Sequence, residues 1–389
     1  MKVKILSCWF TTSYGTYTDG LRRALERLFG SEVGVIASNC GCGDPMEVGR
    51  RFVDQRCEFV EFVNVPYYKK SNALKEWLMV QARQLVYRER ARRYIKLTGE
   101  ADVLHFQQIL NAFGSVTVFN WLSMPCSAAR VVTVHELDPY QLQHPELSVR
   151  YNQADALIVL TEAMRSELIS QGVRSHLIHV VPHGVELRTV SDLPREGIVF
   201  YLGHKLNEAK GLPTLLTALA LLKKELQGQL PLLTIHGHYG APAPEEGVRW
   251  VEAAGLSGSV RWLNEISFDS AVDLYQRSLL CVLPYTGSFA GYPATLALAN
   301  GAVVIGTRAA GLPEHLGEAG VWVEPTDPPG LAAAMLRLLT DEAERRRIAA
   351  LGRARAEHEL SWDAVAQKTR QVYAAALRNR QDPVHAAVH

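Results

Sequence analysis

The sequence has almost no net charge and few cysteines for its length. Its 41 lysines and arginines balance 40 aspartates and glutamates, which leaves a formal net charge of +1 over 389 residues. Nothing global therefore points to nucleic acid or to an acidic partner. The six cysteines are scattered. One close pair, Cys40 and Cys42, has no second ligand pair nearby at zinc spacing, so a loop is favoured over a metal site.

Long apolar runs and a leader pattern are also lacking. No apolar run is long enough to span a bilayer, and the chain starts with a strand-like segment rather than a signal peptide. We therefore expect a protein of the reducing cytoplasm. No Asp-x-Asp triplet occurs, so a metal-chelating diphosphate site of that kind is not supported, and we expect no metal.

Short apolar runs alternate with amphipathic helical segments along the whole chain. The expected strands cover residues 3–8, 33–37, 59–65, 102–106, 131–135, 156–160 and 177–181 in the first half, and 198–202, 232–236, 260–263, 279–284, 302–306 and 321–323 in the second. This alternation is typical of parallel sheets that carry helices on both faces.

A polar, proline-containing segment at 186–196 separates the two halves and is interpreted as a linker. We therefore predict an α/β protein with two Rossmann-like, doubly wound parallel-sheet domains. They cover residues 1–188 and 189–364, and a closing helix with a tail follows at 365–389. Ligands of such sheets bind beyond the carboxyl ends of the strands, so a cleft is expected between two facing domains.

The stretch 285–301 points to an anion. It follows an apolar strand, turns through small residues and places Pro293 in the first turn of a helix expected at 294–299. A strand, a glycine turn and a helix start together present free backbone N–H groups and a partial positive charge. Such a turn can also simply join two elements.

Charged and polar residues follow other expected strands. Lys205 and Lys210 flank a turn before the next helix and suit a diphosphate, although they could also be solvated surface lysines. His135 ends its strand, where a polar side chain can contact a substrate or have a structural role. Gly15 precedes a helix expected at 19–28, so its backbone could approach a ligand closely.

The segment 69–96 is rich in lysine and arginine, with apolar residues interleaved. A basic amphipathic helix can lie on an anionic membrane, here the inner face of the cell membrane. An ordinary solvated helix face is the favoured interpretation.

Taken together, these segments resemble the retaining GT-B glycosyltransferases of family 4 (GT4). The resemblance covers most of the chain and is strongest in the second half. The matching stretches are DVLH at 102–105 (family DVVH), VTVH at 132–135 (TVHD), VVPHGVE at 180–186 (VIPNGVD), 203–211 (GRLxxxKG, with Lys205 in the place of the arginine), ANGAVV at 299–304 (ACGxPVV) and GLPE at 311–314 (GGxPE).

The resemblance implies a nucleotide-diphosphate sugar as donor, with UDP the expected nucleotide, held mainly by the second domain. It implies a carbohydrate or glycolipid acceptor held mainly by the first domain, and transfer with retention and without a metal. In such folds the last helix crosses back to the first domain. A homo-oligomer is compatible with the sequence.

The resemblance also assigns roles to individual residues. Lys205 and Lys210 would bind the donor diphosphate, Gly15 would approach it from the other domain, and His135 would contact the transferred sugar. The other donor-site positions that the resemblance implies are Gly203, Gly237, Glu265, Ile266, Ser288, Gly291, Tyr292 and Thr295.

The sequence departs from the family at two positions. Family members carry two glutamates, eight residues apart, for the hydroxyls of the donor sugar and of the ribose; Ser288 and Leu296 stand there instead. A serine offers a neutral hydrogen bond, roughly half as strong as a charge-assisted one, whereas Leu296 offers none, although Thr295 stands beside it. The two losses together would cost on the order of a few kcal/mol of donor binding.

The leading hypothesis is therefore an active glycosyltransferase with a rewired donor site. The alternative is a non-catalytic GT-B protein that binds a sugar or a partner glycosyltransferase.

Overall fold

The computed structural model describes residues 1–7, 13–39, 57–61, 101–107, 122, 126–137, 142–190, 194–203, 206, 208–237, 243–264, 266–287, 291–309 and 311–381. The chain divides into two compact units, Met1–Val181 together with Val365–His389, and Pro182–Ala364. Residues 182–188, which the sequence interpretation placed in the first domain, belong to the second unit. There the Val185 N–H donates to the Leu360 carbonyl at 2.8 Å, and Val185 pairs with Ser361.

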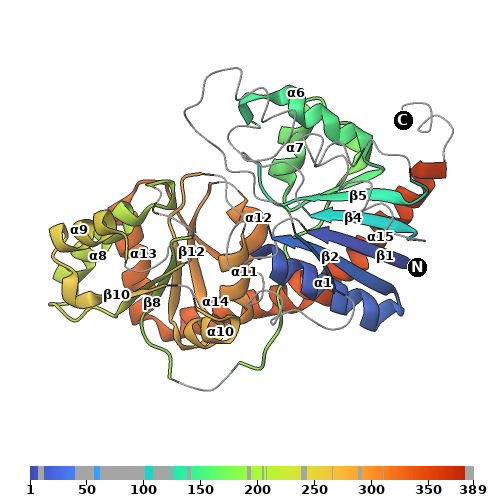
Figure 1. The fold of residues 1–389 in the computed structure, drawn as a ribbon. Coiled ribbons are helices and arrows are strands. Elements are labelled where there is room, and N and C mark those ends of the chain that lie inside the picture. The colour runs from blue at the N-terminus through green and yellow to red at the C-terminus, as the bar shows by residue number, and fades with distance from the viewer. Residues whose placement is uncertain are drawn as a thin grey trace. The chain divides into compact units, whose positions relative to one another are not determined.

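The first unit is built on a seven-stranded parallel sheet of order β3-β2-β1-β4-β5-β6-β7 (Figure 1). Its strands are β1 (Lys2–Ser7), β2 (Glu32–Asn39), β3 (Cys57–Glu61), β4 (Val103–Gln107), β5 (Ala129–Val134), β6 (Ala156–Val159) and β7 (Ile178–Val180). Its described helices are α1 (Ser13–Phe29), α6 (Pro145–Ser148), η1 (Val149–Gln153), α7 (Glu162–Ser170), η2 (Ser175–Leu177) and most of α15 (Trp362–Gln381).

The second unit is built on a six-stranded parallel sheet of order β10-β9-β8-β11-β12-β13. Its strands are β8 (Ile198–Tyr201), β9 (Leu233–His236), β10 (Val260–Leu263), β11 (Leu280–Leu283), β12 (Val303–Thr307) and β13 (Gly320–Val323). Its described helices are η3 (Glu208–Lys210), α8 (Leu212–Glu225), α9 (Glu245–Ala253), η4 (Ser257–Ser259), α10 (Phe268–Arg277), α11 (Tyr292–Ala299), α12 (Leu312–Leu316), η5 (Gly317–Ala319), α13 (Pro328–Thr340), α14 (Glu342–Arg355) and the π-helix η6 (Ala356–Leu360).

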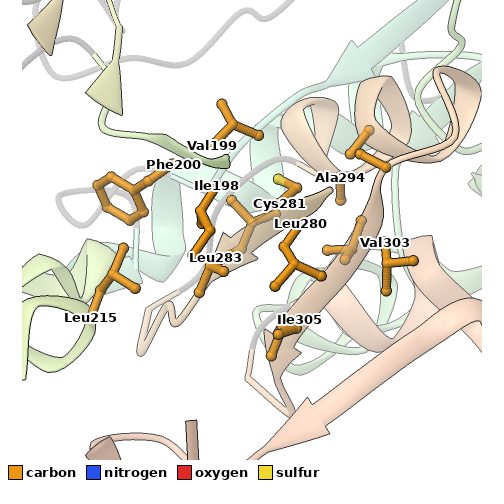
Figure 2. Close-up of a cluster of buried hydrophobic side chains, with 14 of the residues drawn as sticks. Ile198, Val199, Phe200, Leu215, Leu280, Cys281, Leu283, Ala294, Val303 and Ile305 are labelled. Atoms are coloured by element: carbon orange, nitrogen blue, oxygen red, sulfur yellow. The ribbon is translucent and has the colours of Figure 1, made fainter. Parts of the chain in front are cut away.

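The core of the second unit lies between its sheet and the helices that cover it. All four residues of β11 are fully buried, and so are Phe200 of β8 and Leu215 of α8. Figure 2 shows Leu280, Cys281 and Leu283 of β11 in one cluster with Phe200, Leu215, and Val303 and Ile305 of β12. Truncating one such side chain to alanine costs about 2–5 kcal/mol, so this apolar layer fixes the strands whose ends form the site.

The strand predictions are confirmed in both halves, with ends that differ by a few residues; of the strand predicted at 59–65, residues 62–65 lie outside the described part. The helix predictions are less accurate. Helix α1 starts at Ser13 rather than at residue 19, which places Gly15 inside its first turn and not in a loop before it.

In the part of the chain that the structure describes, no helix combines the length and the apolar character that crossing a membrane requires. The basic segment 69–96 lies outside the described residues.

Candidate functional site

The strand order of the second sheet reverses between β8 and β11, and Lys210 lies just beyond the carboxyl end of β8. Such a switch point is where ligands bind in open α/β sheets. The Lys210 side chain is only 9 % exposed. Its Nζ lies 4.1 Å from the ring centroid of Tyr285 and 5.8 Å from that of Tyr201. Lys210 is therefore not a solvated surface lysine, and aromatic faces stabilise its charge.

The turn that carries Lys210 is docked on the segment that follows β11. The Gly211 N–H donates to the Glu208 carbonyl at 2.8 Å, and the Thr286 N–H donates to the Ala209 carbonyl at 2.8 Å. Gly211 has a φ of +73°, and a Cβ there would overlap the carbonyl oxygen of Pro284. Only glycine fits this position without strain. The close approach fixes Lys210 beside the end of β11.

Two helices that start at this edge have no side-chain cap. Helix α8 begins after Gly211 and helix α11 after Gly291, and each has a proline in its first turn. Helices α9 and α12 of the same unit also lack a side-chain cap, whereas α10, α13 and α14 are capped by Ser267, Asp327 and Asp341. Among the described residues, the N-cap positions of α8 and α11 thus offer no side-chain acceptor to the first N–H groups, an arrangement compatible with anion binding.

A buried histidine lies behind the start of α11. The His315 ring packs against Gly291 so closely that a Cβ on Gly291 would overlap it. His315 is 1 % exposed, and among the described residues neither of its ring nitrogens has a hydrogen-bond partner. The neighbouring Tyr292 ring lies 4.9 Å from the His183 ring, centroid to centroid. Packing against the His315 and His183 rings therefore fixes Gly291 and Tyr292 at the start of α11.

The other residues of the second unit that are predicted to bind the donor substrate differ in their burial and surroundings. Gly203 is buried beside the Lys210 side chain, Gly237 is buried just after β9, and Ile266 is half-buried. Thr295 is fully buried and its hydroxyl donates to the Tyr292 carbonyl at 2.9 Å, which does not favour a direct contact with ribose. Leu296 is 2 % exposed and belongs to the core.

Three predicted donor residues, Lys205, Glu265 and Ser288, lie outside the described residues. Within the described part of the chain, no three His, Cys, Asp or Glu side chains come together as metal ligands.

In the first unit, His135 follows β5 at the carboxyl edge of the sheet and is 5 % exposed. Its Nε2 lies 2.6 Å from Oε1 of Gln107, the last residue of β4. The Tyr17 ring of α1 stands edge-on to the His135 ring, with 4.6 Å between centroids. Gly15 is buried in the first turn of α1, where backbone N–H groups have no partner within the helix.

Sequence reasoning missed the groups that surround these residues. Tyr201 and Tyr285 enclose Lys210, and Gln107 holds His135. The alternation of His105 and Gln107 along β4, and of Thr133 and His135 along the neighbouring strand, was a usable signal, since residues two apart in a strand face the same side.

Two family models match the chain. Residues 12–184 match the description "Glycosyl transferase 4-like domain", and residues 196–341 match "Glycosyl transferases group 1". The chain therefore carries a glycosyl transferase 4-like domain followed by a glycosyl transferases group 1 domain. The 4-like domain contains Gln107 and His135, and the group 1 domain contains Lys210 and Gly291.

Relatives and solved structures agree with this assignment. An MMP alpha-(1->4)-mannosyltransferase from Mycolicibacterium hassiacum is 31 % identical over 58 % of this chain, and the match spans 55 % of that protein, about half its length. Sucrose-phosphate synthase from Thermosynechococcus elongatus has a TM-score of 0.75 at 22 % identity, over 96 % of this chain and 98 % of that one. Anabaena HepE in complex with UDP and glucose has a TM-score of 0.72 at 16 % identity, over 96 % and 99 %. These two structures establish the GT-B fold.

Three buried histidines should make this GT-B protein sensitive to acid. Burial lowers the pKa of His105 to about 3 and that of His183 to about 4. Burial, with smaller contributions from His183 and Arg355, lowers the pKa of His315 to about 3. An unfolded histidine has a pKa near 6.5, so the unfolded chain binds more protons below that pH. The free energy of unfolding should therefore be highest above pH 6.5 and fall as the pH drops below it, by on the order of 2 kcal/mol per histidine at pH 5.

Substituting His315→Leu should raise the free energy of unfolding at pH 7 by about 1–3 kcal/mol, because it removes buried nitrogens that have no partner. It should also make stability less sensitive to pH, since one of the three histidines no longer takes up a proton on unfolding. Urea unfolding at pH 7 and pH 5 measures both effects. His358→Leu is the matched control, because His358 is exposed in the same unit. A His315→Leu variant that is less stable at pH 7 and equally acid-sensitive would contradict this account.

Proposed function

We propose that this protein is a glycosyltransferase that moves a sugar from a nucleotide-diphosphate sugar to an acceptor hydroxyl, with retention of anomeric configuration. UDP is the expected nucleotide. The observation that carries the proposal is the nearly buried Lys210 ammonium at the switch point of the second sheet, together with the uncapped starts of α8 and α11. An almost fully buried cation and helix N-termini on one edge form an environment for a diphosphate.

The chemistry of the proposed reaction explains why positive charge is needed there. The bond between the anomeric carbon and the diphosphate oxygen breaks, the acceptor oxygen bonds to that carbon, and the proton of the acceptor hydroxyl passes to the departing diphosphate oxygen. Negative charge grows on the leaving diphosphate. Lys210 and the first N–H groups of α11 would stabilise that charge, which is where enzymes gain most of their rate. In this proposal no metal is needed at the diphosphate.

The donor site is proposed to depend on the diphosphate more than on the hydroxyls. Leu296 is apolar and buried where the resemblance has a glutamate, so a carboxylate bond to the ribose is absent at that position. A neutral site of this kind gains less energy per hydroxyl. Two findings support the proposal: HepE, a structural neighbour, was solved with UDP and glucose, and the Mycolicibacterium relative is named a mannosyltransferase.

The first unit is proposed to bind the acceptor, a carbohydrate or a glycolipid, with His135 close to the transferred sugar. His135 lies at the carboxyl edge of its sheet, which is the edge where ligands of such sheets bind. Its tight packing by Gln107 and Tyr17 fixes the ring in one place, as a group that contacts a reacting sugar requires.

A transfer assay tests the proposal. The purified protein is incubated with UDP-, GDP- and dTDP-sugars and candidate acceptors, and NMR follows the release of nucleoside diphosphate and the anomeric configuration of the product. We expect release from at least one donor, with retention. Donor binding without release would favour the alternative, a non-catalytic GT-B protein that binds sugars. No binding of any donor would contradict the proposal.

A further inference from the structure

A chain of buried polar side chains runs through the first unit from α15 to His135. The Tyr373 Oη lies 2.7 Å from His105 Nδ1, and His105 Nε2 lies 2.7 Å from Thr133 Oγ1. Gln107 joins the two histidines, with its Nε2 at 3.4 Å from His105 Nε2 and its Oε1 at 2.6 Å from His135 Nε2. All five side chains are at most 5 % exposed, so water hardly competes for these hydrogen bonds.

The donors and acceptors of this chain are mutually consistent. With the Gln107 carbonyl oxygen toward His135, the arrangement of this structure, His135 Nε2 carries the proton and donates it. The Gln107 NH₂ group then lies 3.4 Å from His105 Nε2, a long contact that is favourable when that nitrogen is unprotonated. His105 consequently carries its proton on Nδ1 and donates it to Tyr373 Oη, while the Thr133 hydroxyl donates to His105 Nε2.

The two histidines are therefore coupled through one amide. Each neutral imidazole has one donor and one acceptor nitrogen, so moving the proton of His105 to Nε2 would place two donors face to face. A reversal of the Gln107 amide relieves that conflict, and the reversed amide would require an unprotonated Nε2 on His135. Because the network is buried, two donors or two acceptors that face each other cost free energy. Arrangements in which only one of the two histidines has changed its tautomer are therefore rare.

We infer that Gln107 is a positioning residue that holds His135 in the tautomer protonated on Nε2, and that the hydrogen bond between His105 and Tyr373 sets the orientation of Gln107. The Tyr17 ring, edge-on at 89° to the His135 ring, keeps that ring from turning over. A neutral His135 in this tautomer carries its lone pair on Nδ1. That this ring contacts the transferred sugar is a part of the inference that rests on the proposed function.

Nitrogen NMR of the wild-type protein tests the inference without any activity. In protein labelled with ¹⁵N-histidine, long-range proton–nitrogen correlations show which ring nitrogen carries the proton. The signals of His135 and His105 are assigned by their loss in His135→Gln and His105→Gln. We expect His135 protonated on Nε2 and His105 protonated on Nδ1. The opposite tautomer on either ring would overturn the inference, even if no further variant could be made.

Two variants then test the coupling. Gln107→Leu removes both contacts of the amide, and Tyr373→Phe removes only the distant hydroxyl that accepts from His105. Each should shift the tautomer ratio of His135 by about tenfold, the effect of one ordinary hydrogen bond. Gln107→Glu keeps an acceptor for His135 Nε2 and should keep the wild-type tautomer. His135 signals that stay unchanged in both Gln107→Leu and Tyr373→Phe would contradict the coupling.

Tyr275→Phe is the matched control. It removes a buried tyrosine hydroxyl that lies 3.1 Å from His236 Nε2 in the second unit, outside this chain of hydrogen bonds. The tautomer of His135 should not change in this variant. A shift as large as in Tyr373→Phe would mean that the effect reflects a general loss of stability, which would overturn the inference.

Turnover gives a separate readout of the same variants. With transferase activity, Gln107→Leu should lower kcat about tenfold with little change in the donor KM, because it disorders His135 and not the diphosphate site. Gln107→Glu should recover most of that loss. If the wild-type protein transfers no sugar, the proposed function fails, and the NMR result still decides whether Gln107 positions His135.

Discussion

Lys210→Met is expected to weaken the binding of a nucleoside diphosphate by about 10–100-fold, the contribution of one hydrogen bond to a charged group. It should leave the binding of the matching nucleoside unchanged, because a nucleoside has no phosphate for the ammonium to contact. Methionine is one atom shorter than lysine, but its flexible, apolar side chain can pack against Tyr201 and Tyr285. The fold should therefore persist, since replacing a buried charge by an apolar side chain often costs no stability.

Calorimetric titration with UDP and uridine, and with GDP and guanosine, measures the effect of Lys210→Met. Lys224→Met is the matched control, because Lys224 is exposed near the end of α8, away from the switch point. Equal losses of affinity for nucleoside and diphosphate would show that Lys210 supports the fold rather than the phosphates. Unchanged affinity for both would remove Lys210 from the site.

Gly211→Ala is expected to destabilise the second unit by about 3 kcal/mol or more. An alanine at the left-handed φ of Gly211 costs about 1–2 kcal/mol, and overpacking against a neighbour costs about 1–3 kcal/mol more. The neighbour here is the backbone carbonyl of Pro284, which cannot move without shifting the end of β11. Urea unfolding measures the loss, and the affinity for diphosphate should fall with it because the turn that holds Lys210 is displaced.

Gly228→Ala separates backbone strain from the steric conflict. Gly228 also has a left-handed φ, +90°, but a Cβ there would meet no atom within 4 Å. This variant should lose only the backbone cost, about 1–2 kcal/mol, and should bind diphosphate as the wild type does. If the two alanine variants lose equal stability, the close approach of Gly211 to Pro284 does not organise the site.

The strands could be predicted from the sequence because each is an apolar run buried on both faces. Residues 280–283, for instance, are fully buried and read as a strand without knowledge of their neighbours. The start of α1 was predicted wrongly, because glycine and threonine near Gly15 are poor helix formers. Tertiary burial overrides that preference, since Tyr17 and Leu21 are fully buried in the structure.

Positions in the candidate site could be predicted only where they depend on a single helix or strand. The position of Lys210 after a strand, and of Pro293 in the first turn of a helix, are local properties of the sequence and are confirmed. The aromatic surroundings of Lys210 come from strand ends that lie 84 residues apart, at Tyr201 and Tyr285. The order of the strands in the sheet brings these two ends together, and no local sequence pattern encodes that order.

The partners of His135 were missed for the same reason. His105 and Tyr373 are separated by 268 residues and meet because α15 belongs to the first unit. The alternation of polar residues along β4 and β5 indicates a shared face, but not which groups form hydrogen bonds. The parallel register pairs Gln107 with Thr133, which lies two residues before His135 and on the same face of the sheet.

Calorimetric titration of the wild-type protein with nucleoside diphosphates, each compared with its own nucleoside, tests the central claim most directly. The account predicts that at least one of UDP, GDP and dTDP binds about 100-fold or more tightly than its nucleoside. The reason is that the Lys210 ammonium and the first N–H groups of α8 and α11 bind the phosphates. It would be contradicted by a protein that binds none of them, or that binds diphosphate and nucleoside equally.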